Sequence, residues 1–375
     1  MNFNSETIEK LISNTYEIDC IDIRLTQKID NEPIVYMGPG TIYQDEHGVL
    51  QIKLYSKIAD IKKEISHQFK YYTPGKIMPA DNYFILKATD ISGTEWISDN
   101  ISVSGNISIP TGSGVIKSSL KEIETIEKGS STKKNHLFVI IPGSYEIPYN
   151  EKEKLATGIG YRNKAVFTIN NIAFEFKKLD NCLIIKADSA PDYLKADTYI
   201  KLLEALSIIT GIIMRPIVVK NDQQDHTILK IKSVDNSYSN KKFPQPFNHS
   251  LPDRLPAFSC FVGKYLEAID APFSDLFGFW HKINRSWQAD IENSALSLAV
   301  SIEGLISSYF ANLGLPDDEI TQQADKAKQK IGDIDLGERI RDWLLSSVSG
   351  LLNNSSPKSA LYRMVQNDLL SKKMV

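Results

Sequence analysis

The stretch SWQADIENSALSLAVSIEGLISSYFANL, residues 286–313, decides how the last third of this chain folds. Its apolar residues recur at helical spacing and share one side of a helix. They are Ile291, Leu298, Ile302, Leu305 and Ile306, widened by Ala295, Ala299, Val300 and Phe310. Asp290, Glu292 and Glu303 are its only formal charges, too few for a surface helix. We therefore expect a long, mostly buried helix that neighbouring helices cover on more than one side.

Helical patterns continue on both sides of this stretch. Amphipathic spacing occupies residues 257–270, 273–284 and 336–352, and Pro316 opens a further helix with acids in its first turn. Ser356 and Pro357 suit the start of a last helix. That helix is still amphipathic at Val375, so we expect the natural protein to continue and this chain to be truncated.

The first half of the chain has the alternation of strands instead. Residues 16–27 alternate apolar and polar side chains, and residues 33–43 and 49–55 form a hairpin around Gly48. Several further short strands follow, at 83–88, 94–98, 101–109, 136–141, 162–169, 172–177, 182–187, 217–219 and 228–234. One helix is expected at 192–214. Short strands at this spacing favour an antiparallel sandwich or barrel.

These patterns predict an α+β protein. A β-rich recognition domain spans residues 1–245, a polar, proline-punctuated linker spans 246–256, and an all-helical domain spans 257–375. With 375 residues, the chain exceeds the usual size of a single core. Two domains are therefore the default expectation.

Composition restricts the class of protein further. Hydrophobic residues make up 42% and charged residues 24%, as in ordinary globular proteins. The net charge of -3 gives no general attraction to nucleic acid or anionic lipid. The three cysteines form no CxxC pair, no secretory signal opens the chain, and no apolar run is long enough to cross a bilayer. We expect a cytoplasmic protein without a membrane partner.

No motif predicts a cofactor or a metal. Gly158 and Gly160 form a GxG that lacks a following helix, and Gly38-Pro39-Gly40 is interpreted as a turn. The six histidines show no metal-binding spacing, and DQQDH at residues 222–226 has the composition of a solvated loop. The expected cofactors and metals are therefore none.

Glu303, in the long helix, is a candidate functional residue. Its neighbours are apolar, so we expect its carboxylate at or beside a packed interface, where it must be paired, hydrogen-bonded or protonated. An ion pair to Arg339, Arg341 or Arg363 is the structural interpretation, and a functional role is the alternative. The same three arginines are candidate RNA contacts, although Glu338 and Asp342 among them are also typical of an ion-paired, solvated face.

The segment SALSLAVSIEGLISSYF and the helices after it resemble HEPN domains, particularly those of ApeA-type bacterial anti-phage proteins. The segment GTIYQDEHGVLQIKLYS resembles the opening hairpin of the β-rich domain that precedes them. The resemblance implies a protein that dimerises and cuts RNA during phage infection, causing growth arrest. Its catalytic signature is an arginine followed four to six residues later by a histidine, and no arginine here has one. Among the residues of this chain, only Glu303 matches a position of the family's pattern, namely the polar position in the long helix.

Two classes of function follow from this resemblance. The first is an abortive-infection effector whose β-rich domain senses a phage protein and whose helical domain forms a homodimer and cleaves RNA, a metal-independent endoribonuclease if the chain continues beyond residue 375. The second is a non-enzymatic sensor or scaffold that recognises a protein or ligand through the β-rich domain. A nucleotide-binding enzyme with an unrecognised site is a third hypothesis.

Overall fold

The computed structural model describes residues 4–29, 31–57, 79–108, 113–128, 134–154, 160–190, 193–223, 225–235, 252–269, 274–287, 289–310, 318–353, 360 and 364. Its contacts divide the chain into two compact units, Met1–Pro272 and Phe273–Val375, which we describe separately. The expected linker, residues 246–256, lies mostly outside the described residues. The helix after it, α4 (Leu255–Ala268), packs within the first unit against α3 (Thr198–Thr210) and the sheet.

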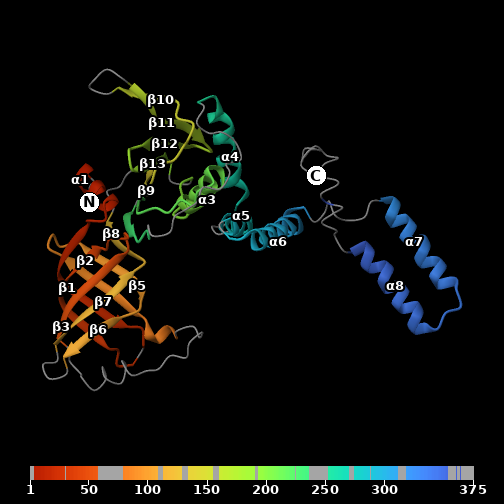
Figure 1. The fold of residues 1–375 in the computed structure, drawn as a ribbon, viewed down its shortest axis with the longest axis horizontal. Helices are drawn as coiled ribbons and strands as arrows, with labels where there is room; N and C mark the ends of the chain where they lie inside the picture. The colour runs from red at the N-terminus through yellow and green to blue at the C-terminus, as the bar shows by residue number, and fades with distance from the viewer. Residues whose placement is uncertain are drawn as a thin grey trace. The chain divides into compact units, whose positions relative to one another are not determined.

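The first unit is dominated by one large antiparallel sheet (Figure 1). In sheet order its strands run β10-β11-β12-β13-β9-β14-β15-β8-β5-β4-β1-β2-β3-β7-β6. Their bounds are β1 Glu17–Gln27, β2 Val35–Gln44, β3 Leu50–Lys57, β4 Phe84–Asp90, β5 Glu95–Ile101, β6 Ser104–Ser108, β7 Ser113–Leu120, β8 Glu122–Lys128, β9 Asn135–Pro142, β10 Glu151–Lys154, β11 Gly160–Ile169, β12 Ile172–Lys178, β13 Cys182–Ser189, β14 Val218–Asp222 and β15 His226–Lys232. Together with the helices below, this sheet confirms the predicted α+β class.

The predicted hairpin around Gly48 is present and joins β2 to β3. Asp45 Oδ1 accepts hydrogen bonds from the backbone N–H groups of His47 and Val49, each at 3.0 Å. Gly48 takes φ +85°, a left-handed conformation that glycine adopts without strain. The turn therefore has the local chemistry that sets the register of the two strands.

Gly38-Pro39-Gly40 is not a turn, contrary to the sequence-based prediction, and lies inside β2. A Cβ atom on Gly40 would lie 2.2 Å from the carbonyl oxygen of Lys53 on β3. The two glycines therefore serve the close approach of two strand backbones rather than a change of chain direction.

The strands from β8 to β7 form a curled part of this sheet. β7 and β8 lie at opposite ends of that run, yet only Lys121 separates them in sequence. Hydrogen bonds bring both end strands to β5: Ser98 Oγ of β5 donates to the Glu122 carbonyl of β8, and Ser118 Oγ of β7 donates to the carbonyl of Ser102, the residue after β5, each at 2.5 Å. The apolar residues that alternate along these strands consequently face a common core, which includes Ile23, Leu25, Ile42, Leu54, Phe84 and Trp96.

A second core lies between β9–β13 and two helices. Phe258 of α4 packs edge-on against Phe167 and Phe176 of the sheet, with ring centroids 5.9 and 6.2 Å apart. Helix α3 adds Leu202, Leu206 and Ile209 to the same cluster. It is shorter than the predicted 192–214, and Gly211 with φ +71° ends it.

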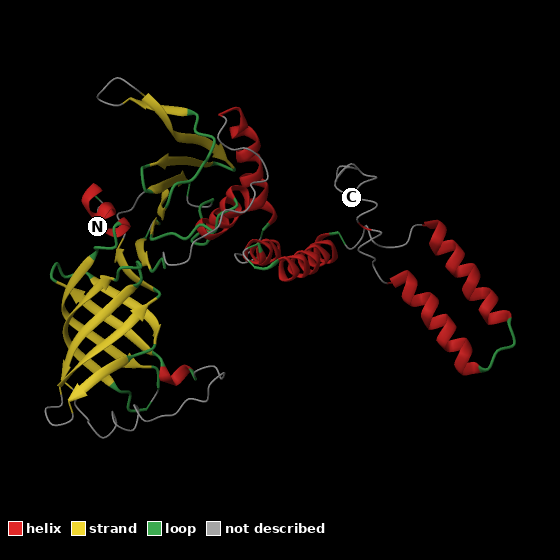
Figure 2. Ribbon diagram, viewed as in Figure 1, coloured by secondary structure: helices red, strands yellow, loops and turns green. Residues whose placement is uncertain are grey.

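The second unit contains two helix pairs (Figure 2). Helix α5 (Asp275–Ser286) packs against α6 (Ile291–Tyr309), and α7 (Asp318–Asp333) packs against α8 (Glu338–Asn353). The remaining described helices are α1 (Ser5–Ile12) and two short 3-10 turns at Ala80–Asn82 and Pro252–Arg254. The last predicted helix, after Ser356, lies outside the described residues apart from positions 360 and 364.

Candidate functional site

Helix α6 forms where the sequence predicts it, and its caps explain its bounds. Asp290 is the N-cap, and its Oδ1 accepts the N–H of Asn293 at 2.8 Å. The N–H of Phe310 closes the last turn on the Ile306 carbonyl at 2.9 Å. An ionised N-cap also suits the positive end of the helix, and the pKa of Asp290 is lowered, first by the backbone hydrogen bond from Asn293.

The face of α6 that packs on α5 is built from small residues. Ser294, Ser297, Ser301 and Gly304 are spaced three, four and three residues apart, and all four are at least half-buried. The ring of Phe279 lies over Gly304, so that a Cβ atom there would be 2.2 Å from its Cε1. Tyr309 Oη accepts the N–H of Leu276 at 3.1 Å and thereby ties the end of α6 to the start of α5.

Most of the bulky apolar residues of α6 are exposed rather than covered by α5. Ile291 is 88% exposed, Leu298 41% and Ile302 39%, and in the whole helix only Ser301 and Ile306 are buried. The prediction of a mostly buried helix covered on more than one side is therefore wrong for the described chain. The physical reason is that α5 covers the small residues, whose lack of bulk permits close packing, and leaves the bulky stripe open.

This open stripe has the spacing of a coiled coil. Its members, Ile291, Ala295, Leu298, Ile302, Leu305 and Tyr309, follow one another at intervals of four, three, four, three and four residues. Alternating steps of three and four keep side chains on one seam that a second helix can pack against. We call these six residues the α6 seam.

Glu303 of α6 is exposed to solvent and is not a member of the seam. Among the residues that the structure describes, it forms no ion pair with Arg339 or Arg341. The expectation of a carboxylate at a packed interface, paired to Arg339 or Arg341, is therefore wrong within this part of the chain, and the third expected partner, Arg363, lies outside the described residues. An exposed carboxylate keeps its hydration and needs no partner.

Of the three candidate RNA-contacting arginines, the structure describes Arg339 and Arg341, which both belong to α8. Arg341 donates through Nη2 to the carbonyls of Ile334 and Leu336, at 3.2 and 3.3 Å, and so stabilises the turn between α7 and α8. Arg339 is exposed on α8, and Arg363 lies outside the described residues. The structure thus gives Arg341 a structural role that sequence reasoning did not foresee.

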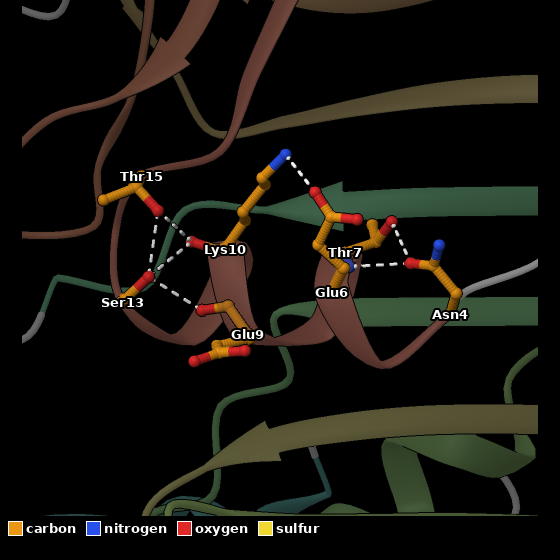
Figure 3. A network of polar contacts seen from close by, with 7 residues as sticks. All are labelled: Asn4, Glu6, Thr7, Glu9, Lys10, Ser13 and Thr15. Atoms are coloured by element: carbon orange, nitrogen blue, oxygen red, sulfur yellow. Dashed lines mark hydrogen bonds and ion pairs between the residues drawn. The ribbon is translucent and has the colours of Figure 1, made fainter.

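The first unit contains a groove beside α1, a helix that sequence reasoning missed. Figure 3 shows how its ends are closed: Asn4 Oδ1 accepts the Thr7 N–H at 2.8 Å, and Ser13 Oγ donates to the Glu9 carbonyl at 2.8 Å. Lys10 pairs with Glu6 at 2.8 Å on the same helix. The signals for this helix were present in the N-cap Asn4 and in the apolar residues that follow it.

The groove has a volume of about 910 Å³, with α1 on one side and strands β9 and β13 and the β12–β13 turn on the other. Apolar side chains form much of its lining, namely Ile8, Ile12, Phe138, Leu179 and Ile184. Lys177, Lys186 and Glu9 add charge. Burial raises the pKa of the Cys182 thiol, which also lines the groove, to about 11 and so favours its protonated form at neutral pH.

Sheet register brings together a further pair that sequence reasoning missed. His136 Nδ1 lies 2.5 Å from Asp188 Oδ1, because β9 and β13 place the two residues directly opposite each other. Asp222, from the DQQDH segment, lies opposite His136 on the other side, but its carboxylate binds Lys220 and Thr227. No group of three His, Cys, Asp or Glu residues within the described part could hold a metal ion.

Comparison of the chain with protein-family models, with curated proteins and with solved structures finds no match. Within the described ranges, no helix combines the length and the apolar character needed to cross a membrane. The proposed function below therefore rests on the α6 seam and the groove beside α1.

Proposed function

We propose that this protein is a cytoplasmic anti-phage effector of the HEPN-like, ApeA-like kind, in which the β-rich unit recognises a phage protein and the helical unit forms a homodimer. The observation that carries the proposal is the exposed α6 seam. Contiguous apolar stripes on a folded surface mark interaction sites. Full burial of one leucine or isoleucine side chain contributes roughly 1.5–3 kcal/mol, so covering the seam is strongly favourable.

The order of the seam residues supports pairing of identical helices. Intervals of four, three, four, three and four read the same in both directions. An antiparallel pair about a twofold axis therefore sets Ile291 of one copy against Tyr309 of the other, Ala295 against Leu305, and Leu298 against Ile302. A twofold interface requires this self-complementarity.

Recognition is assigned to the β-rich unit. We infer that its curled strands, β1 to β8, close into a barrel, because that arrangement removes exposed sheet edges. The groove beside α1 combines an apolar lining with a few charged groups, as ligand sites do. A phage protein segment bound there is the trigger that this proposal requires.

Metal-independent RNA cleavage is the second proposal. The order of the helices and the exposed carboxylate of Glu303 on α6 support it. The missing arginine-to-histidine spacing counts against it, and a non-enzymatic sensor or scaffold is the alternative. Incubating the chain and its Glu303→Gln variant with total RNA separates these functions, because only an enzyme produces discrete fragments that the variant reduces.

The experiment for the first proposal compares three chains by light scattering and by phage challenge of expressing cells. The unmodified chain should have the mass of a dimer and reduce plaque numbers. Leu298→Glu places a charge in the seam and should give a monomer without protection. Val300→Glu alters an exposed residue outside the seam, 55% accessible, and should behave as the unmodified chain. A monomeric unmodified chain would refute the homodimer.

A further inference from the structure

One wall of the groove beside α1 is a single side of that helix. The residues that line the groove from α1 are Ser5, Ile8, Glu9, Ile12 and Ser13, and they repeat at the three- and four-residue spacing of one helix side. Ile8 and Ile12 are only partly buried, so both retain apolar surface that a partner can cover. This wall therefore presents two isoleucines with one carboxylate between them in sequence.

The opposite wall is one face of the sheet. Cys182, Ile184 and Lys186 alternate along β13, and Phe138 of β9 lies opposite Lys186 in the strand register. The side chains between them, such as Ile185, belong to the core that α3 and α4 cover. The groove consequently lies on the sheet face opposite those two helices.

The sheet wall offers side chains but no edge. β13 lies between β12 and β9, and β9 lies between β13 and β14, so the backbone groups of both strands are already paired. A peptide that adds itself as a strand needs an open edge, and a proline-rich segment needs aromatic walls. Among the described lining residues, Phe138 alone is aromatic. The recognition mode that remains is an amphipathic helix that lays its apolar side in the groove.

The charged residues of the groove differ in whether they are already compensated. Lys186 Nζ lies 3.7 Å from a carboxylate oxygen of Glu175, and Lys177 also interacts with another residue. Glu9 on α1 and Asp180 at the β12–β13 turn are exposed, and neither forms an ion pair within the described part of the chain. The charges left for a partner to neutralise there are therefore two carboxylates, one on each side of the groove.

The other charges of α1 do not compete for such a partner. Lys10 Nζ pairs with Glu6 at 2.8 Å, and Figure 3 shows the Glu9 carboxylate on the side of the helix away from this pair. Lysine and arginine can lay their apolar stems along an apolar surface and keep the charged end at its rim. Basic side chains at the border of an apolar stripe therefore match both the isoleucines and the carboxylates of this groove.

We propose that the groove beside α1 binds an amphipathic helix in which basic residues border an apolar stripe. The stripe packs on Ile8, Ile12 and Phe138, and the basic residues pair with Glu9 and Asp180. The inference rests on the proposed function in one respect, namely that a segment of a phage protein is the partner of this groove. It adds the chemistry by which that segment is recognised.

The test is titration of the full chain, followed by fluorescence anisotropy, with two labelled model peptides of about 15 residues, a length that can form an isolated helix. The first peptide has leucine on one side of its helix and lysine on the other. The second has glutamate in place of every lysine. The lysine peptide should bind, and the glutamate peptide should bind at least about tenfold more weakly. No binding of the lysine peptide, or equal binding of the two, would overturn the proposal.

Variants of the groove locate the binding. Ile8→Gln keeps a good helix former in α1 and should weaken binding of the lysine peptide about fivefold or more. The double variant Glu9→Gln with Asp180→Asn should weaken it about tenfold. The matched control, Glu6→Gln with Glu95→Gln, removes two exposed carboxylates outside the lining and should change affinity less than about twofold. An equal effect of the control would contradict pairing with Glu9 and Asp180.

A variant of the α6 seam excludes binding of the peptide elsewhere. Leu298→Glu should leave the affinity for the lysine peptide unchanged within about twofold, because the groove lies in the other unit. Loss of binding in this variant alone would place the peptide on the seam and overturn the proposal. Circular dichroism of each variant establishes that the fold is intact.

Phage challenge of expressing cells separates this inference from the proposed function. If the lysine peptide fails to bind but Ile8→Gln abolishes protection, the groove still receives a partner and the helix chemistry proposed here is wrong. If the lysine peptide binds as described but Ile8→Gln protects fully, the helix-binding groove stands and its assignment to the phage trigger is wrong.

Discussion

The ring of Phe279 in α5 occupies the space that a side chain at Gly304 in α6 would need, with Cε1 2.2 Å from the position of a Cβ atom. This one relationship explains why α5 covers the small-residue face of α6. A bulkier face could not approach another helix as closely. It also leaves the apolar seam available for a different partner.

Enlarging Gly304 should therefore disrupt the helix pair. We expect Gly304→Val to destabilise α5–α6 by about 1–3 kcal/mol, because the ring of Phe279 must move. Gly278→Ala is the matched control, since no atom lies within 4 Å of its added Cβ, and it should stabilise α5 by about 0.5–1 kcal/mol. Hydrogen exchange of α5 and α6 peptides measures both effects. Equal protection in the two variants would contradict the packing described here.

Removing the charge of Glu303 should leave stability unchanged. Its exposed carboxylate has no ion-pair partner among the described residues, so Glu303→Gln should shift the free energy of unfolding by less than about 0.5 kcal/mol. Urea titration followed by circular dichroism gives this value. A loss above 1 kcal/mol would mean that the side chain is buried, for example in an association of two copies, and dilution of the protein distinguishes the two cases.

The buried carboxylate of Glu204 should behave in the opposite way. It is 3% exposed on α3 and accepts a hydrogen bond from the Tyr265 hydroxyl of α4 at 2.7 Å. Tyr265→Phe removes this buried hydrogen bond and should cost about 1–3 kcal/mol. Tyr193→Phe, at an exposed position, is the control and should cost almost nothing. The comparison is made from denaturant midpoints, and equal midpoints would contradict a contribution from this bond.

Acid should loosen the β4–β5 turn through Asp90. Burial acts to raise the pKa of Asp90, but hydrogen bonds from Ser92, Trp96 and Thr94 outweigh it and hold the pKa below its ordinary value. A lowered folded-state pKa stabilises the fold above the unfolded value of about 3.9. This stability is lost as the pH falls through the folded-state pKa. Asp90→Asn should reduce the fall of the melting temperature at acidic pH. If the variant loses as much melting temperature at acidic pH as the unmodified chain, Asp90 is not the cause of that loss.

Helix α1 should depend on its cap more than on its ion pair. Asn4→Ala leaves the Thr7 N–H without its side-chain acceptor and should cost about 1 kcal/mol of helix stability. Lys10→Gln removes the exposed pair with Glu6, which solvent screens, and should cost much less helix stability than Asn4→Ala. Hydrogen exchange of the α1 peptide ranks the two variants. The reverse ranking would show that the cap does not hold this wall of the groove.

Much of the secondary structure could be predicted from local patterns alone. Alternation along β1 and the turn chemistry of Asp45 and Gly48 act between residues close in sequence, and each element forms where they indicate it. The α6 seam was likewise visible as a row of apolar residues. Gly38-Pro39-Gly40 misled because its turn-like composition serves close strand packing instead.

The sequence by itself determined the α+β class, the main hairpin and the helical period of α6, because these follow from short-range sterics, hydrogen bonding and hydrophobic spacing. Only the tertiary structure decided which face of α6 is covered. It also decided which residues lie opposite each other on neighbouring strands, such as Lys53 and Lys117 or His136 and Asp188. Those relations depend on strand register and helix packing between residues far apart in the chain. A periodic pattern states which residues share a face, but the identity of the surface that covers that face is settled by steric fit, as between Gly304 and Phe279.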